Sequence, residues 1–87
     1  MNTNLYCLFD RVSNRFMPTF EQVNDAAAAR EVRGILRRDI ILQPEDYDLV
    51  RVCELIRTED EGQARISVRE ISVVVPFNRN LTEGANQ

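Results

Sequence analysis

The sequence predicts one small α+β domain, in which a single helix covers one face of an antiparallel sheet. Three observations lead to this fold class. Two apolar segments separated by a turn open the chain of 87 residues, one amphipathic segment follows, and two or three further strand-like segments complete it. This order of elements is a ββαβββ arrangement. A small, compact five-stranded barrel similar to an OB-fold is the alternative.

The first two strands are expected to form a hairpin. Residues 5–9 are apolar at every position, which is typical of a central strand covered on both faces, and Asp10 ends the run. The Ser-Asn step that follows supplies a turn. Residues 15–20 form the second strand, which Pro18 confines to an edge or a strand end because proline cannot donate a backbone hydrogen bond.

An amphipathic helix is predicted after the hairpin. Asn24 or Asp25 can cap it, and it extends to about Arg38, so that acid lies at its start and arginine at its end, as the helix dipole favours. At about 100° per residue, one face collects the apolar side chains Ala28, Ala29, Val32, Ile35 and Leu36. The far side carries Arg30, Arg33 and Arg37.

The second half of the chain is expected to add the remaining strands. Pro44 can start a single helical turn that leads into the next strand. Residues 49–57 are strand-like, with apolar side chains on both parities. Residues 58–62 form the following turn, in which Gly62 supplies a left-handed conformation.

The last strand is expected to contain a β-bulge. Ile66 and Val68 share one parity, whereas the later apolar residues share the opposite one, namely Ile71, Val73 and Val75. A bulge or break near Arg69 and Glu70 must therefore reverse the facing of the strand. Pro76 then ends it.

One domain accounts for the whole chain, because so short a sequence cannot divide into two cores. We expect residues 1–77 to form this domain and the polar residues 78–87 to form a flexible C-terminal tail. No run approaches the ~20 apolar residues of a membrane span, and the N-terminus has no basic region followed by an apolar stretch. We therefore expect a cytoplasmic protein without a membrane partner.

The composition argues against most enzymes. The chain contains neither His nor Lys, so the usual general base and the commonest metal ligand are missing. Cys7 and Cys53 are expected to be buried, unpaired core residues, and two thiolates do not close a structural zinc site. The acidic segments 45–46 and 59–61 lack the alternating spacing of a calcium loop and are expected to be solvated turns. We expect no catalytic residues, no metal and no cofactor.

Charge is distributed unevenly along the chain. The net charge is −3, from fourteen acidic residues against eleven arginines. Six of the arginines lie in the first half, whereas seven of the acidic residues crowd residues 45–61. One side of the domain is therefore expected to be basic and another acidic.

Four motifs resemble one known family. They are Leu5-Tyr6-x-x-Phe9-Asp10, Phe16-x-Pro18-x-Phe20, Asn24-Asp25-x-x-Ala28-x-Arg30 and, most specifically, Pro44-Glu45-Asp46-Tyr47-Asp48-Leu49. Together they cover residues 5 to about 62 and resemble the small non-structural protein of gokushoviruses, the tailless single-stranded DNA bacteriophages of the Microviridae. The resemblance implies a DNA-binding protein that acts around viral single-stranded DNA synthesis or packaging, in the cytoplasm of the host bacterium.

Arginines are the first candidates for DNA binding. Arg30, Arg33 and Arg37 have no acidic residue three or four positions away, so no ion pair within the helix neutralises them. Bidentate contacts to phosphate oxygens would do so, and Arg38 completes this candidate set. The alternative is that acidic residues of this chain or of a partner copy pair with them instead, namely Glu45, Asp46 and Asp48.

Aromatic rings are the second candidates, because single-strand binders stack bases on them. Tyr6 and Tyr47 are included since a phenol can lie at a surface, whereas a core role is expected for Phe9, Phe16 and Phe20.

A homodimer is expected because residues 5–9 and 49–56 are apolar on both faces while only one helix is available as cover. The leading functional hypothesis is a non-enzymatic protein that binds single-stranded DNA with low sequence specificity. The alternative is a protein-interaction or assembly factor that binds a phage or host protein.

Overall fold

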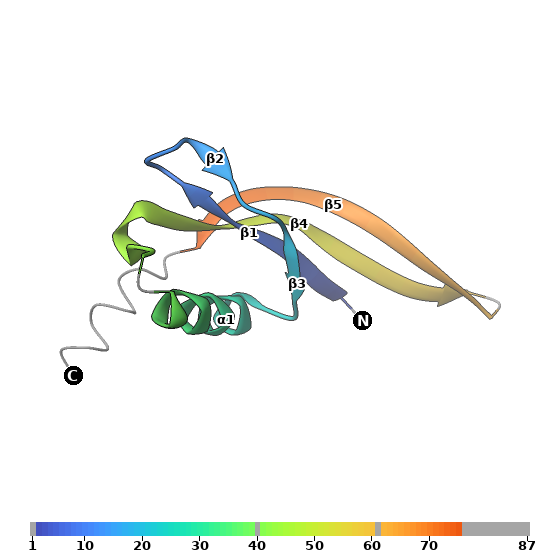
Figure 1. The fold of residues 1–87 in the computed structure, drawn as a ribbon. Coiled ribbons are helices and arrows are strands. Elements are labelled where there is room, and N and C mark those ends of the chain that lie inside the picture. The colour runs from blue at the N-terminus through green and yellow to red at the C-terminus, as the bar shows by residue number, and fades with distance from the viewer. Residues whose placement is uncertain (1, 40, 61, 76–87) are drawn as a thin grey trace.

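The fold was obtained as a computed structural model, which describes residues 2–39, 41–60 and 62–75. One antiparallel sheet curls like half of a barrel, and one helix packs against one of its faces (Figure 1). The elements follow the order β1 (Asn2–Asp10), β2 (Arg15–Phe16), β3 (Phe20–Gln22), α1 (Asp25–Arg38), the 3-10 turn η1 (Pro44–Asp46), β4 (Tyr47–Asp60) and β5 (Gln63–Val75). The predicted α+β class is confirmed, and the curl brings it close to the OB-like alternative.

The strand order is β2-β1-β4-β5, and β3 also pairs with β1. The prediction of one continuous second strand over residues 15–20 is wrong, because β2 and β3 are separate short strands that border the same edge of β1. Pro18 lies between them and has no amide hydrogen to donate. The expected turn before β2 is present, and Asn14 adopts a positive φ of 60° there.

Helix α1 begins and ends where its sequence predicts. Asn24 is the N-cap, and its side chain accepts a hydrogen bond from the Ala27 amide at 2.8 Å. Arg37 and Arg38 occupy the last turn, near the negative end of the helix dipole. The apolar face of the helix packs on the sheet in a core of Tyr6, Leu8, Ala28, Ala29, Val32, Leu36, Tyr47, Leu49 and Val75.

Strands β4 and β5 form a hairpin that is longer than predicted. β4 already begins at Tyr47, and it continues to Asp60, so the turn is shorter than the expected residues 58–62. Gly62 has the left-handed conformation that was predicted, with φ of 81°. Beyond the pairing of Ile56 with Asn2 of β1, none of the described residues forms a third strand beside the hairpin, which continues as a two-stranded arm, residues 57–60 and 63–66 (Figure 1).

Irregular pairing bends this hairpin in its middle. Arg51 pairs with Val73 and Cys53 with Glu70, so Val52 of β4 lies opposite two residues of β5. The predicted bulge is therefore confirmed just beyond Glu70. The register of β4 against β1 also shifts at this point, which places both irregularities where the sheet curls.

The two faces of the sheet can be assigned from the register, because residues paired across strands share a face. Tyr6, Arg51 and Val73 lie on the face covered by α1. The opposite face, here called the open face, has no helix upon it in the described part of the chain. Its apolar residues are Leu5, Cys7, Phe9, Phe16, Val50, Cys53, Leu55, Ile66, Val68 and Val74.

Within the described residues, no helix is long and apolar enough to cross a membrane. The predicted tail, residues 78–87, lies outside the described residues, as does the predicted strand end at Pro76.

Candidate nucleic-acid interface

Four basic side chains gather on the side of α1 that faces away from the sheet. Arg30, Arg37 and Arg38 are exposed, and Arg33 is half-buried. At about 100° per residue, Arg30 and Arg37 nearly superimpose along the helix axis, with Arg33 beside them and Arg38 at the flank. We call these four residues the arginine face.

The arginine face is not neutralised by the residues that the structure describes. None of its members takes part in an ion pair there, although other arginines do. Within the described part of the single chain, the alternative pairing of these arginines with Glu45, Asp46 and Asp48 is not formed. Asp48 instead lies 3.5 Å from Arg11, which also donates to the main-chain oxygen of Glu45. Arg11 therefore holds this acidic segment beside the β1–β2 turn.

A shallow hollow of about 460 Å³ lies beside the first half of α1. Its lining consists of Val23, Asn24, Ala26, Ala27, Arg30 and Arg33. Gly34 continues this open surface, since a Cβ built on it would meet nothing within 4 Å. There is therefore open space beside α1 at Gly34.

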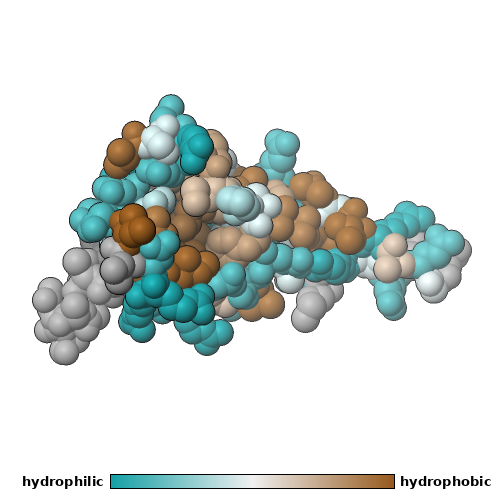
Figure 2. Space-filling model, viewed as in Figure 1, coloured by the Kyte–Doolittle hydropathy of each residue, from teal (hydrophilic) through white to brown (hydrophobic). Residues whose placement is uncertain are grey.

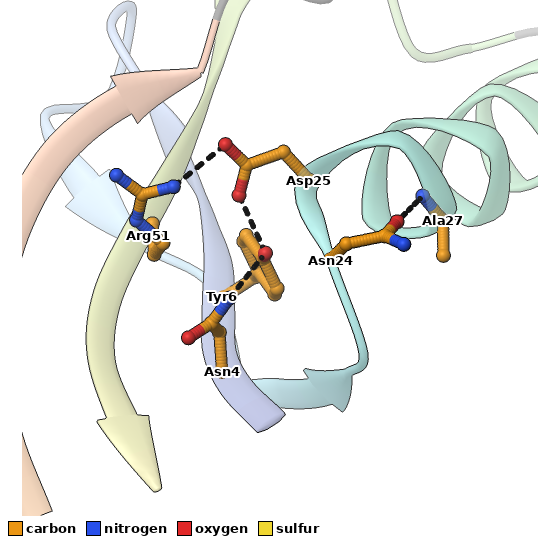
Figure 3. A network of polar contacts seen from close by, with 6 residues as sticks. All are labelled: Asn4, Tyr6, Asn24, Asp25, Ala27 and Arg51. Atoms are coloured by element: carbon orange, nitrogen blue, oxygen red, sulfur yellow. Dashed lines mark hydrogen bonds and ion pairs between the residues drawn. The ribbon is translucent and has the colours of Figure 1, made fainter. Parts of the chain in front are cut away.

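The structure places Tyr6 in the core rather than at the surface. The Tyr6 hydroxyl donates to Asp25 Oδ1 at 2.6 Å and accepts from Asn4 Nδ2 at 3.0 Å (Figure 3). Asp25 Oδ2 also accepts a hydrogen bond from Nη1 of Arg51 at 2.6 Å, so this network joins α1 to β1 and β4. Burial raises the pKa of Tyr6, and the hydrogen bond to Asp25 raises it further.

Tyr47 is buried as well, at the start of β4. Burial, followed by the charges of Asp10, Asp46 and Asp39, raises its pKa. The two tyrosines do not join the arginine face, and neither ring is open to a nucleic-acid base. Both are candidates by sequence because a phenol tolerates water, but sequence alone does not reveal which face of a strand the helix covers.

The structure also corrects the expectation that Phe16 lies in the core. It was expected in the core, yet its side chain is 67% exposed on the open face, where it contacts Phe9 at a ring-centroid distance of 4.7 Å. Phe20 does pack at the core, stacked on Tyr6 at 5.9 Å. The signal for Phe16 is its position on a strand that Pro18 confines to an edge, because an edge strand has a neighbouring strand on one side only and its side chains pack against fewer neighbours.

Cys7 and Cys53 are buried and unpaired, as predicted. Burial raises the pKa of Cys7, so its thiol stays protonated near neutral pH. Among the described residues, no three His, Cys, Asp or Glu side chains converge in the way that metal ligands do.

A family model described as Phage ORF5 protein matches residues 3–75. The match covers β2 to β5 and α1 completely, and all of β1 except Asn2. No curated protein and no solved structure is similar enough to this chain to count as a match.

Proposed function

Since the chain belongs to the phage ORF5 protein family, we propose that it is a non-enzymatic DNA-binding protein that uses its arginine face. It acts in the host bacterial cytoplasm, on single-stranded viral DNA, during genome synthesis or packaging. The similarity of its motifs to the gokushovirus non-structural protein supports this finer assignment.

One observation carries the proposal. Arg30, Arg33, Arg37 and Arg38 lie together on one helix without an acidic partner among the described residues. Like charges at this spacing cost a few tenths of a kcal/mol per pair. Phosphate oxygens would remove this repulsion, because a guanidinium presents paired donors that match two oxygens of a phosphate.

The net charge of −3 does not prevent such binding. The acidic segment that precedes β4 is held by Arg11 at the β1–β2 turn, rather than on the arginine face. A local field of one sign attracts a polyanion even when the total charge of the protein has the opposite sign.

Low sequence specificity follows from the side chains involved. Arginines that contact phosphates fix the position of the backbone but do not read bases. Neither Tyr6 nor Tyr47 is available to stack on a base. The binding is therefore electrostatic and sensitive to salt.

A filter-binding titration at several salt concentrations tests the proposal. In the variant Arg33→Gln/Arg37→Gln, affinity for single-stranded DNA should fall for every sequence, and the salt slope should flatten by roughly one to two units, at about 0.7 per lost phosphate contact. Gln keeps most of the helix propensity of Arg, so the fold should persist. Comparison with duplex DNA measures the preference for single strands.

The matched control is Arg65→Gln/Arg69→Gln, which removes the same charge from exposed positions of β5. It should leave the salt slope near that of the wild type. Equal losses in both double variants would mean that net charge, not the arginine face, sets affinity. Wild-type protein without any salt-sensitive binding would refute the DNA role.

A second candidate function, binding of a phage or host protein, is favoured by the exposed Phe16 on the open face. It predicts that Phe16→Ser abolishes partner capture from infected cells while DNA binding is unchanged.

A further inference from the structure

The open face of the sheet exposes several large apolar side chains in the single chain, and such surfaces can mark sites of protein–protein contact. Phe16, Ile66, Val68 and Val74 are each exposed by 58% or more. In Figure 2, hydrophobic side chains recur along the surface of the sheet from the β2 end toward the β4–β5 arm. This surface goes beyond the proposed DNA contact, because the arginine face lies on the other side of the molecule.

The apolar side chains form two patches at opposite ends of the open face. One patch surrounds a hollow of about 290 Å³, lined by the open-face residues Phe9, Phe16, Asp48, Val50 and Val74 and, at the β5 edge of the sheet, by Ser72 and Val73. The other, the arm patch, consists of Leu55, Ile66 and Val68, where β4 and β5 leave the rest of the sheet. One end is therefore concave, whereas the other projects.

We propose that the open face binds the open face of a second copy of this chain, with the arm patch of each copy seated in the hollow of the other. Rotation by 180° about an axis that crosses the strands stacks the two sheets face to face and brings both pairs of patches together. A two-fold dimer makes each contact twice, so one pair of complementary surfaces is sufficient.

The exposed area fits a dimer of ordinary size. At roughly 150–200 Å² for each fully exposed side chain of this kind, the four exposed residues contribute on the order of 400 Å² per copy. A standard interface buries about 800 Å² per partner, of which a little over half, roughly 450 Å², is apolar. The face therefore supplies the apolar area that a stable dimer needs.

The overall shape of the molecule also supports a second copy of the chain as the partner that covers the open face. The molecule measures 51 × 30 × 20 Å, and its radius of gyration is 14.9 Å, compared with about 12 Å for a compact domain of this length. Two strands alone are marginally stable in water, which leaves the arm in need of further packing. A second copy provides that packing. The arm patch and the hollow of one copy lie about 20–25 Å apart along β5, and the same distance separates their partners on the second copy.

Pairing of β5 with the β5 of a second copy would be a different dimer, and the edge of this strand argues against it. Arg65 and Arg69 place charge along the edge, and the bulge opposite Val52 interrupts its hydrogen-bonding pattern. Charge and bulges are the features by which edge strands avoid such pairing.

Light scattering coupled to size exclusion at about 10–100 µM tests the proposal. The wild type should have about twice the chain mass of 10.1 kDa. Val68→Glu in the arm patch and Phe16→Glu at the hollow should each raise the dissociation constant of the dimer at least about tenfold, because a charge would enter the interface. Both sites are exposed in the single chain, so circular dichroism should show an unchanged fold.

Two further experiments make the result decisive. Ile41→Glu, at an 83% exposed residue after α1, is the matched control and should leave the dimer intact. An equimolar mixture of the Val68→Glu and Phe16→Glu proteins should partly restore dimers, since one of the two patch contacts in the mixed dimer is then wild type. A wild-type mass near 10 kDa, or dimers unaffected by either variant, would overturn the proposal. Failure of the mixture to dimerise would reject the pairing of arm patch with hollow.

Discussion

The two faces of the sheet bury their apolar side chains to very different extents. On the helix-covered face, Tyr6 and Leu49 are completely buried. On the open face, Val68 and Val74 of β5 keep about 60% of their surface in water, although Val75 of the same strand is buried on the helix-covered face. Cys7 and Cys53, by contrast, are buried on the same face. Strand composition therefore does not determine burial, which also depends on tertiary packing around each residue.

Removal of equivalent apolar groups from the two faces should have the largest and most unequal effect. Leu49→Ala leaves a cavity beneath α1 and should lower the free energy of unfolding by about 2–5 kcal/mol. Val68→Ala removes a largely hydrated side chain and should lower it by about 0.5 kcal/mol or less in the monomer. Urea unfolding of both variants at low protein concentration measures the difference. Equal losses would mean that the open face is covered even in the monomer.

The polar network on the helix-covered face should give the next largest effect. Asp25→Asn weakens the contacts to the Tyr6 hydroxyl and to the Arg51 guanidinium, and should cost about 1.5–3 kcal/mol in unfolding free energy. Nε of Arg51 is already buried without a hydrogen-bond partner, so rearrangement of this side chain would compensate little for the weakened contact with residue 25. Glu45→Gln, which removes an exposed carboxylate, is the control and should change stability by less than about 0.5 kcal/mol. A loss as large in the control would point to net charge instead.

Alkaline pH should weaken the helix-covered face through its tyrosines. The pKa values of Tyr6 and Tyr47 are raised above the usual value of 10.0, so the folded state holds their protons more tightly than the unfolded state does. Their contribution is complete below pH 10 and is lost as pH rises through the folded pKa values, at up to about 1.4 kcal/mol per pH unit for each group. Cys7, whose pKa is also raised, adds a loss in the same direction above pH 9.

Urea titrations between pH 8 and 11 should therefore show stability falling above about pH 9–10. Tyr6→Phe should make the decline shallower, since only Tyr47 and Cys7 then remain. An unchanged slope in Tyr6→Phe would indicate that the Tyr6 phenol is not held as described.

The smallest effect is expected on the outer side of α1, away from both sheet faces. Gly34→Ala should raise the free energy of unfolding by roughly 0.5–1 kcal/mol, because alanine favours the helix and its Cβ would meet no atom within 4 Å. Thermal unfolding measures the gain. A loss of DNA affinity in this stabilised variant would show that phosphates approach the helix backbone at Gly34.

The features that sequence predicted well are those determined locally. The Asn24 cap, the Pro44 turn, the left-handed Gly62 and the bulge after Glu70 each depend on a few adjacent residues. The apolar stripe of α1 likewise identified its packed face and, by exclusion, the arginine face.

The errors concern long-range contacts. Residues 5–9 are apolar at every position, so parity alone did not show that Tyr6 faces the helix while Phe9 faces away from it. The division of the second strand depends on how the chain passes Pro18 along β1, and the length of the arm depends on pairing between β4 and β5. Such properties arise from tertiary packing and have no local sequence signal.

The two-stranded arm gives the molecule a gradient of local stability. Amides near Ile56 belong to three hydrogen-bonded strands, whereas amides near Thr58 and Arg65 belong to two. Opening can therefore start at the tip and progress toward β1 without unfolding the core, as in other cooperative subunits of proteins. Hydrogen exchange should accordingly become slower from tip to root in the single chain. The arm can thus open and close locally while α1 and the sheet beneath it remain intact.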